Sequence, residues 1–225
     1  MSAASGQPRK LPTGPWQGLL SHALRLVDEV AARGIHDPFW TFGGGTVLML
    51  RYQHRRSKDI DIFVPDPQYL GHVTPRLSDV AEAISQDYVE GAGYVKLIRP
   101  EGEIDFVASP NLTTNAFDLW TLQGRSVRVE TAAEIVAKKL WYRGDQASAR
   151  DLFDLSLVVE REPEALAARW LTTTVSSGWI STQTLISGVA PWLCAIGIWK
   201  PSINPPPMAL LVARTRLVGH LPRAR

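Results

Sequence analysis

Residues 42–63 read FGGGTVLMLRYQHRRSKDIDIF, and this stretch decides both the expected fold and the expected chemistry. It opens on three glycines, which allow a close backbone approach because they carry no Cβ. A helix is expected from Thr46 to Tyr52, and a helix that follows such a turn directs unpaired N–H groups toward an anion. Residues 59–64 alternate between acidic and apolar side chains, which predicts a strand.

Side chains two residues apart on a strand leave the same face, so we expect Asp59 and Asp61 to lie side by side. Neighbouring carboxylates repel each other unless a cation lies between them, and magnesium prefers oxygen ligands. Asp105 occurs in a second alternating stretch, residues 103–108, and is the candidate for a third metal ligand or for a general base. Together the three carboxylates predict a site for two magnesium ions. A solvated strand edge is the alternative interpretation of an isolated Asp-x-Asp.

The regions around this stretch predict a mixed fold. Helices are expected at 16–34, at 74–88, from Thr131 onward and at 149–160, and strands at 94–99, 103–108 and 126–129. This order predicts an α+β fold, with a small mixed sheet flanked by helices, a helical C-terminal part and an atypical tail. We expect a disordered N-terminus at 1–15, a core at 16–130, a helical part at 131–165 and the tail at 166–225.

Composition narrows the class of protein. Hydrophobic residues make up 45% of the chain and charged residues 20%, as in an ordinary globular protein. Cys194 is the single cysteine, so an internal disulfide and a thiolate zinc site are excluded, and a reducing, cytoplasmic location is expected. The N-terminus lacks the pattern of a secretory signal, and the apolar stretch after Trp170 holds too many polar residues for a membrane span.

Charge is unevenly distributed along the chain. All 22 acidic residues precede residue 165, whereas residues 165–225 contain six basic residues and no acidic one. A thin basic tail is the simple interpretation, and an electrostatic contact with nucleic acid is the functional alternative.

Two segments resemble the AbiEii/AbiGii family of nucleotidyltransferases, the toxin halves of bacterial toxin–antitoxin and abortive infection systems. The first is residues 42–63, with its Gly-Gly-Thr-x-Leu turn, His-Arg-x-Ser loop and Asp-Ile-Asp strand. The second is ETAAEIVAKKLWYRGDQASARDLFDL, residues 130–155, in which a lysine helix precedes Arg-Asp-Leu-x-Asp-Leu. The likeness extends over about residues 16–160 and implies the same α+β fold.

The resemblance implies magnesium-dependent transfer of a nucleotide from a nucleoside triphosphate to a tRNA end or a protein hydroxyl. It also implies that a cognate antitoxin binds the protein. In the first segment, it assigns Gly44 and Gly45 to the phosphate turn, with Thr46 opening the helix, and Asp59 and Asp61 to the metal.

The resemblance also assigns residues of the second segment. Lys139 matches the lysine that contacts the triphosphate, with Lys138 as the alternative, and Arg150, Asp151 and Asp154 match the motif that follows. Lys139 lies near an apolar line of its helix, so it is expected to point inward and to need an anion. That anion is either a bound phosphate or the Asp151/Asp154 helix, in which case the contact is a structural ion pair.

The basic loop that precedes the acidic strand has two interpretations. Arg55, Arg56 and Lys58 either contact nucleotide phosphates or an RNA acceptor end, or form a solvated loop. Ser57 is expected to cap the local turn rather than to react.

Two further function classes stay open. A catalytically degenerate copy would bind nucleotide or antitoxin without turnover. A metal-dependent hydrolase is disfavoured, because none of the five histidines pairs at ligand spacing near the acids.

Overall fold

The structure, a computed structural model, describes residues 6–143 and 148–162, so the tail expected at 166–225 lies outside the described residues. The chain divides into two compact units. One consists of Met1–Asn111 and Phe117–Thr131, and the other of Leu112–Ala116 and Ala132–Arg225.

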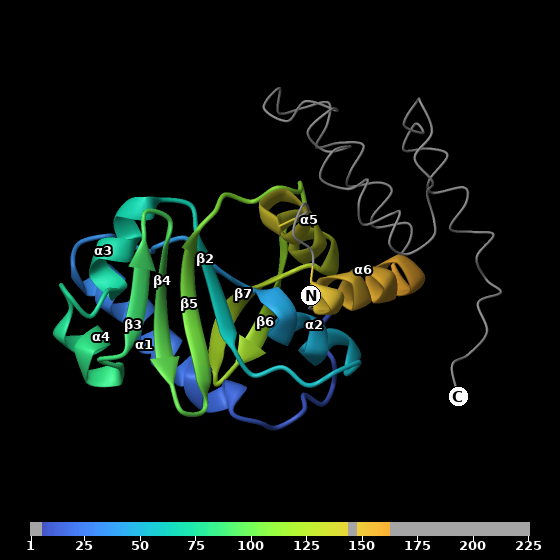
Figure 1. The fold of residues 1–225 in the computed structure, drawn as a ribbon, viewed down its shortest axis with the longest axis horizontal. Helices are drawn as coiled ribbons and strands as arrows, with labels where there is room; N and C mark the ends of the chain where they lie inside the picture. Colours follow the sequence, from blue (N-terminus) through green and yellow to red (C-terminus); the bar gives the residue numbers. More distant parts are fainter. Residues whose placement is uncertain (1–5, 144–147, 163–225) are drawn as a thin grey trace. The chain divides into compact units, whose positions relative to one another are not determined.

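The first unit is built on a mixed sheet (Figure 1). Its strands are β1 (Thr41–Gly43), β2 (Ile60–Val64), β3 (Tyr88–Gly91), β4 (Tyr94–Arg99), β5 (Gly102–Ala108), β6 (Phe117–Leu122) and β7 (Arg125–Glu130). Their order across the sheet is β3-β4-β5-β2-β1-β7-β6. The β2–β5 and β1–β7 pairs are parallel, and the other neighbouring pairs are antiparallel.

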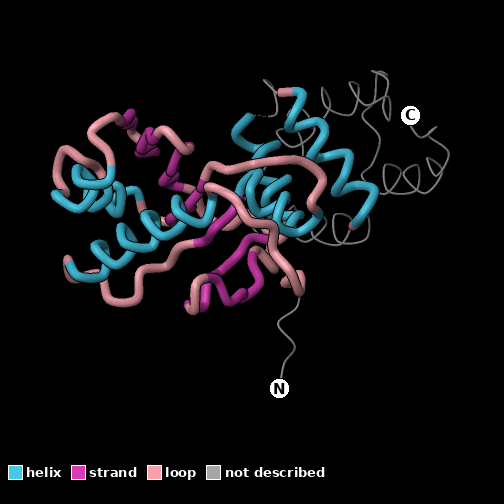
Figure 2. The backbone as a smooth tube through the Cα atoms, turned by 90° about the horizontal axis from the view of Figure 1, so that it is seen from below, coloured by secondary structure: helices cyan, strands magenta, loops and turns pink. Residues whose placement is uncertain are grey.

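The helices of the first unit pack on this sheet or on one another. They are α1 (Trp16–Ala32), α2 (Gly44–Tyr52), the 3-10 helix η1 (Pro67–Tyr69), α3 (Leu70–Val73) and α4 (Asp79–Ile84). Helix α1 contacts β2, β5, α3 and α4, whereas α2 contacts β1, β2 and β7. Figure 2 distinguishes the helices, strands and loops in a second view. The expected α+β architecture is therefore confirmed.

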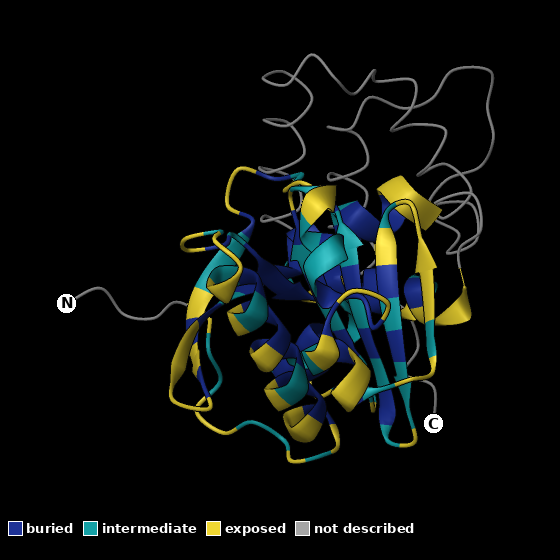
Figure 3. Ribbon diagram, turned by 90° about the vertical axis from the view of Figure 1, so that its left-hand side faces the viewer, coloured by how far each residue is buried: buried dark blue, intermediate teal, exposed yellow. Residues whose placement is uncertain are grey.

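The central strands separate an apolar face from a polar face. Ile60 and Ile62 of β2 and Ile104 and Phe106 of β5 are almost fully buried, while the residues between them are intermediate. Figure 3 shows this alternation along the strands. Burying one face of each strand fixes which way every side chain points, and so it fixes the direction of the acidic residues.

The helix expected at 74–88 is wrong over most of its length. Thr74 precedes Pro75 and is extended, because a residue before proline avoids the helical region. Helix α4 begins only after Ser78, whose hydroxyl accepts a hydrogen bond from the N–H of Ala81. From Tyr88 the chain forms β3, which the sequence did not predict because its pairing partner β4 decides it.

Strand β6 was also not predicted. It pairs with β7 across a two-residue turn at Gln123 and Gly124, both of which have positive φ. A turn of this kind matches the twist of a hairpin.

The second unit contains the segment 112–116 and the helices α5 (Ala132–Arg143) and α6 (Ala149–Arg161), which pack against each other. Helices from about Thr131 and over 149–160 were predicted, so both are confirmed. Within the described residues, no helix has the length and apolar character that crossing a membrane requires.

The domain boundaries expected at residues 15, 130 and 165 stay predictions. Of the N-terminal segment expected to be disordered, residues 6–15 belong to the described part of the chain. There the Gln7 side chain exchanges two hydrogen bonds with the backbone of Thr121 on β6.

Candidate functional site

The glycines form the first turn of α2, so the helix begins at Gly44, two residues before the expected Thr46. Gly44 has a φ of +72°, and a Cβ at this position would overlap the Asp61 carboxylate. A Cβ at Gly45 would overlap the Arg55 guanidinium. Gly44 is therefore required both for its backbone conformation and for space, whereas at Gly45 the overlap is with the movable end of a long side chain. The structure brings Asp61 and Arg55 together at the N-terminus of this helix.

The three predicted carboxylates come from neighbouring strands. The parallel pairing of β2 and β5 places Asp61 directly opposite Asp105. Asp59, one residue before β2, accepts a hydrogen bond through Oδ1 from the backbone N–H of Glu103, at 3.0 Å. The structure thus brings the third acid beside the Asp-x-Asp pair, although its role in metal binding stays a prediction.

The surroundings of Asp105 disfavour its charged form. Burial raises the pKa of its carboxyl group, the charges of Glu103 and Asp59 add to the rise, and Lys96 opposes it. Its Oδ1 is buried and has no hydrogen-bond partner among the described residues. A buried carboxylate oxygen without a partner is costly, so this atom is where an additional cation would be most stabilising.

Lys96 was not singled out from the sequence, yet it contacts this acid. Its Nζ lies 2.9 Å from Asp105 Oδ2 and also donates to Glu103. Burial lowers the pKa of the Lys96 ammonium, but the hydrogen bonds to the two carboxylates outweigh this effect and hold the pKa above its ordinary value. The alternation of β4 and its short turn to β5 are the sequence signals that could have found Lys96.

A magnesium ion requires oxygen ligands, and carboxylates are the usual ones that a protein supplies. Among residues 6–143 and 148–162, no three or more His, Cys, Asp or Glu side chains form a group that could hold a metal ion. Asp61 and Asp105 nevertheless offer hard oxygen ligands from adjacent strands, and Asp105 Oδ1 has no hydrogen-bond partner there. Two carboxylates of this kind would suit a magnesium ion whose remaining ligands were substrate phosphates and water.

Thr46 was expected to open the helix, but it lies inside the first turn of α2. It is fully buried, and its hydroxyl donates to the backbone carbonyl of Asp59 at 2.6 Å and lies 3.0 Å from the Ser57 hydroxyl. The N–H of Ser57 in turn donates to Met49 Sδ. Thr46 therefore ties α2 to the loop that carries Asp59, and it acts by positioning that loop.

The Thr46→Val substitution should lower the free energy of unfolding by about 1–3 kcal/mol, because it leaves the Asp59 carbonyl without its donor at nearly constant side-chain volume. Urea denaturation measures this change. Thr46→Ser retains the hydroxyl and should recover most of the loss. Equal stability of the Val and Ser variants would show that the hydroxyl does not hold the loop.

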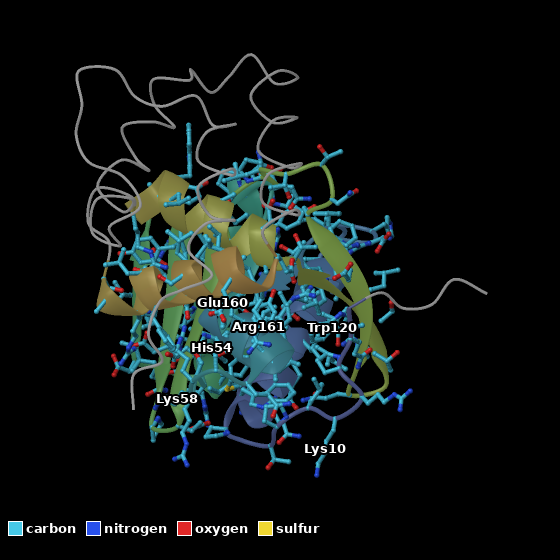
Figure 4. All side chains as sticks on the ribbon, turned by 90° about the vertical axis from the view of Figure 1, so that its right-hand side faces the viewer. Lys10, His54, Lys58, Trp120, Glu160 and Arg161 are labelled. Carbon is cyan, nitrogen blue, oxygen red and sulfur yellow. The ribbon has the colours of Figure 1, made fainter. Side chains whose placement is uncertain are left out.

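The basic loop lies between α2 and β2, and Figure 4 labels His54 and Lys58 on it. Arg55 is half-buried against Gly45, whereas Arg56 and Lys58 are exposed. Of the three basic residues, Arg55 is therefore the one that the structure brings to the N-terminus of α2. Its predicted contact with nucleotide phosphates stays a prediction.

In the second unit, Lys139 points inward, as predicted. Its Nζ lies 2.9 Å from Asp151 Oδ1 and 2.6 Å from Asp154 Oδ2, and all three side chains are buried. Arg150 of the same motif is exposed. The structure thus brings Lys139 together with both motif acids, which is the ion pair that the sequence left open as an alternative.

Lys138, the alternative to Lys139, contacts a different acid, Glu134. It is also buried, and its Nζ lies 3.6 Å from Glu134 Oε1, one helical turn away. The Glu134 carboxylate accepts hydrogen bonds from the N–H groups of Leu112 and Thr113 and from the Thr113 hydroxyl. Lys138 therefore contacts the acid that holds the 112–116 segment, whereas Lys139 contacts the Asp151/Asp154 motif.

Asp151 couples the stability of the α5–α6 pair to pH. Burial raises the pKa of its carboxyl group, but the hydrogen bonds from Lys139 and Ser148 outweigh burial and hold the pKa below the ordinary value of 3.8. A carboxyl group with a depressed pKa contributes stability that is present above pH 3.8 and is lost as the pH falls further. Each pKa unit corresponds to about 1.4 kcal/mol.

We therefore expect the difference in unfolding free energy between wild type and Asp151→Asn to be largest near pH 7 and to shrink below about pH 4. Urea titrations at a series of pH values measure it. A difference that stays constant down to pH 2.5 would contradict the coupling.

The chain is similar to a known protein family. The model of the family described as "Nucleotidyl transferase AbiEii toxin, Type IV TA system" matches residues 25–212. No curated protein matches the chain.

Three solved structures have low similarity to the chain. An antigenic nucleotidyltransferase-like protein from Paracoccidioides brasiliensis is 13% identical, with a TM-score of 0.47, covering 91% of this chain and 95% of that one. The antibiotic-resistance factor ANT(2'')-Ia is 11% identical, with a TM-score of 0.44 and coverage of 81% and 95%. JHP933 from Helicobacter pylori is 17% identical, with a TM-score of 0.36 and coverage of 79% and 91%.

The family match extends beyond the 16–160 region that carried the resemblance and reaches into the residues expected as a tail. Since it includes most of the chain, the protein belongs to the AbiEii family of nucleotidyl transferase toxins of type IV toxin–antitoxin systems.

Proposed function

We propose that this nucleotidyltransferase uses magnesium, held by Asp61 and Asp105 with Asp59 beside them, to transfer a nucleotide from a nucleoside triphosphate to an acceptor hydroxyl. The observation that carries the proposal is the register pairing of Asp61 with Asp105, with the Asp61 carboxylate lying against Gly44 at the start of α2. This combines a carboxylate pair with a helix N-terminus suited to phosphate.

The protein's own groups account for most of the reaction. Backbone N–H groups at Gly44 and Gly45 and the Arg55 guanidinium would bind triphosphate oxygens. The acceptor oxygen forms a bond to the α-phosphorus, the bond to the bridging oxygen breaks, and pyrophosphate leaves. Asp105 would complete the metal site through Oδ1, with the acceptor proton passing to water, or would itself be the base that takes this proton where no metal is bound to it. Magnesium, when bound, would neutralise the negative charge of the phosphates.

For Lys139 we retain the proposed role in steadying the triphosphate, with Lys138 and Asp154 as nucleotide-binding candidates. The geometry adds a condition to this proposal. Lys139 already carries two carboxylate partners, so a phosphate would have to share the ammonium, whose three donors permit a further bond.

The test is transfer of label from α-labelled nucleoside triphosphates in magnesium buffer, with total tRNA in one reaction and a protein extract in another. Label in RNA would support a tRNA end as the acceptor, and label in protein would support a protein hydroxyl. The Asp61→Asn variant is the matched control. If wild type transferred no label in either reaction, while remaining folded, the proposal would fail.

We also propose that the protein acts as a toxin in the cytoplasm, where nucleoside triphosphates occur, and that a cognate antitoxin binds it. Induction of wild type should arrest growth, and induction of Asp61→Asn should not. Equal growth of the two strains at equal expression would argue against toxicity through this site.

A degenerate, nucleotide-binding copy is the second candidate, and the ammonium on Asp105 is the observation that favours it. Magnesium-dependent nucleotide binding by calorimetry, without transfer of label, would support this alternative.

A further inference from the structure

Lys96 of β4 lies at the polar face of the sheet beside the proposed metal ligands. The antiparallel register of β4 and β5 sets it directly opposite Asp105, and the parallel register of β5 and β2 sets Asp105 opposite Asp61. The three side chains therefore occupy one row across three neighbouring strands. Lys96 donates to Asp105 Oδ2 at 2.9 Å and to Glu103 on the same strand.

The two oxygens of Asp105 are not equivalent. Oδ2 is bonded to Lys96, whereas Oδ1 is buried without a hydrogen-bond partner among the described residues. The Asp105 side chain is 20% exposed, so water screens its charge poorly. With Asp59, Asp61 and Glu103 also nearby, an ionised Asp105 requires a positive charge whenever no metal is bound.

We propose that Lys96 is a positioning residue that serves as the built-in counter-cation of Asp105, holding Oδ2 and leaving Oδ1 to the magnesium ion. This inference rests on the proposed function, because it assumes that Asp105 and Asp61 are metal ligands. Lys96 then stabilises the metal-free protein. It also weakens metal binding, because its positive charge repels the incoming cation.

A purely structural Lys96–Glu103 pair at a partly exposed strand is the alternative. Such a pair contributes little to stability and does not affect a metal ion bound elsewhere. Rescue by Asp105→Asn therefore separates the two interpretations, because only a counter-cation of Asp105 becomes dispensable when that acid is neutral.

The experiment compares Lys96→Gln, which keeps a donor but removes the charge, with Lys96→Arg, which keeps the charge. Affinity for Mn²⁺ alone, as a probe for magnesium, is measured by electron paramagnetic resonance. Melting temperature is measured in chelator and at saturating Mg²⁺.

We expect Lys96→Gln to bind Mn²⁺ about tenfold more tightly, since one like charge is removed near the site. It should also melt lower than wild type in chelator and gain more from Mg²⁺. Lys96→Arg should remain near wild type in both.

A metal-independent arm keeps the two proposals distinguishable. In chelator, Lys96→Gln/Asp105→Asn should be more stable than Lys96→Gln alone, because neutralising Asp105 removes the need for a counter-cation. If wild type binds no Mn²⁺, the proposed function fails, and this rescue still tests whether Lys96 neutralises Asp105. If wild type binds Mn²⁺ but Lys96→Gln has unchanged Mn²⁺ affinity and no rescue by Asp105→Asn, the role of Lys96 is overturned.

Discussion

Asp61→Asn should reduce the rate of nucleotidyl transfer by roughly a thousandfold or more, which corresponds to about 4 kcal/mol of lost transition-state stabilisation. The substitution keeps the shape of the side chain beside Gly44. It removes the carboxylate charge that lies opposite Asp105 in the β2–β5 register. Single-turnover transfer of labelled nucleotide measures the rate, and circular dichroism checks that the fold is retained.

Asp87→Asn is the matched control for this prediction, because Asp87 is an exposed aspartate in the turn between α4 and β3. It should transfer nucleotide at the wild-type rate. A loss of less than tenfold in Asp61→Asn would show that this carboxylate does not contribute to the transfer step.

Lys139→Met should lower the free energy of unfolding of the α5–α6 unit by about 3–5 kcal/mol, because it removes the ammonium that two buried carboxylates share. The Lys139 ammonium lies within 2.9 Å of both Asp151 and Asp154, and Asp154 is fully buried. Urea denaturation followed by far-ultraviolet circular dichroism measures the loss.

Neutralising the two acids in the same chain provides the control. Lys139→Met/Asp151→Asn/Asp154→Asn should recover part of the stability, since two buried amides cost less than two buried carboxylates that have lost the Lys139 ammonium. An unfolding free energy of Lys139→Met within about 1 kcal/mol of wild type would fit a solvated ion pair. It would contradict a stabilising buried contact of Lys139 with Asp151 and Asp154.

Local patterns in the sequence predicted a large part of the fold. The alternation of Ile60 and Ile62 with Asp59 and Asp61 fixed a strand with one buried face, and the three-and-four spacing at 16–34 fixed α1. These predictions were confirmed because a helix or strand with one buried face repeats its apolar residues at the period of its own backbone. The same reasoning failed at 74–88, where Pro75 and the pairing of β3 with β4 outweighed helical spacing.

Part of the candidate site was accessible in the same way. The glycine turn and the Asp-x-Asp pair are close in sequence, so their residue types alone suggested phosphate and metal. Lys96 could also have been found, because the two-residue turn after Arg99 sets Lys96 opposite Asp105. It was missed because a lysine in a strand is ordinarily solvated.

The sequence by itself determined which residues could perform the chemistry: Gly44 and Gly45, the pair of Asp59 and Asp61, and Lys139. Only the tertiary structure decided where their partners lie. Asp105 follows Asp61 by 44 residues, and their pairing depends on the register of two parallel strands, which no local pattern specifies. The approach of the Asp61 carboxylate to Gly44 was likewise decided by how α2 packs on β2, because such contacts depend on distant chain segments meeting in a close-packed core.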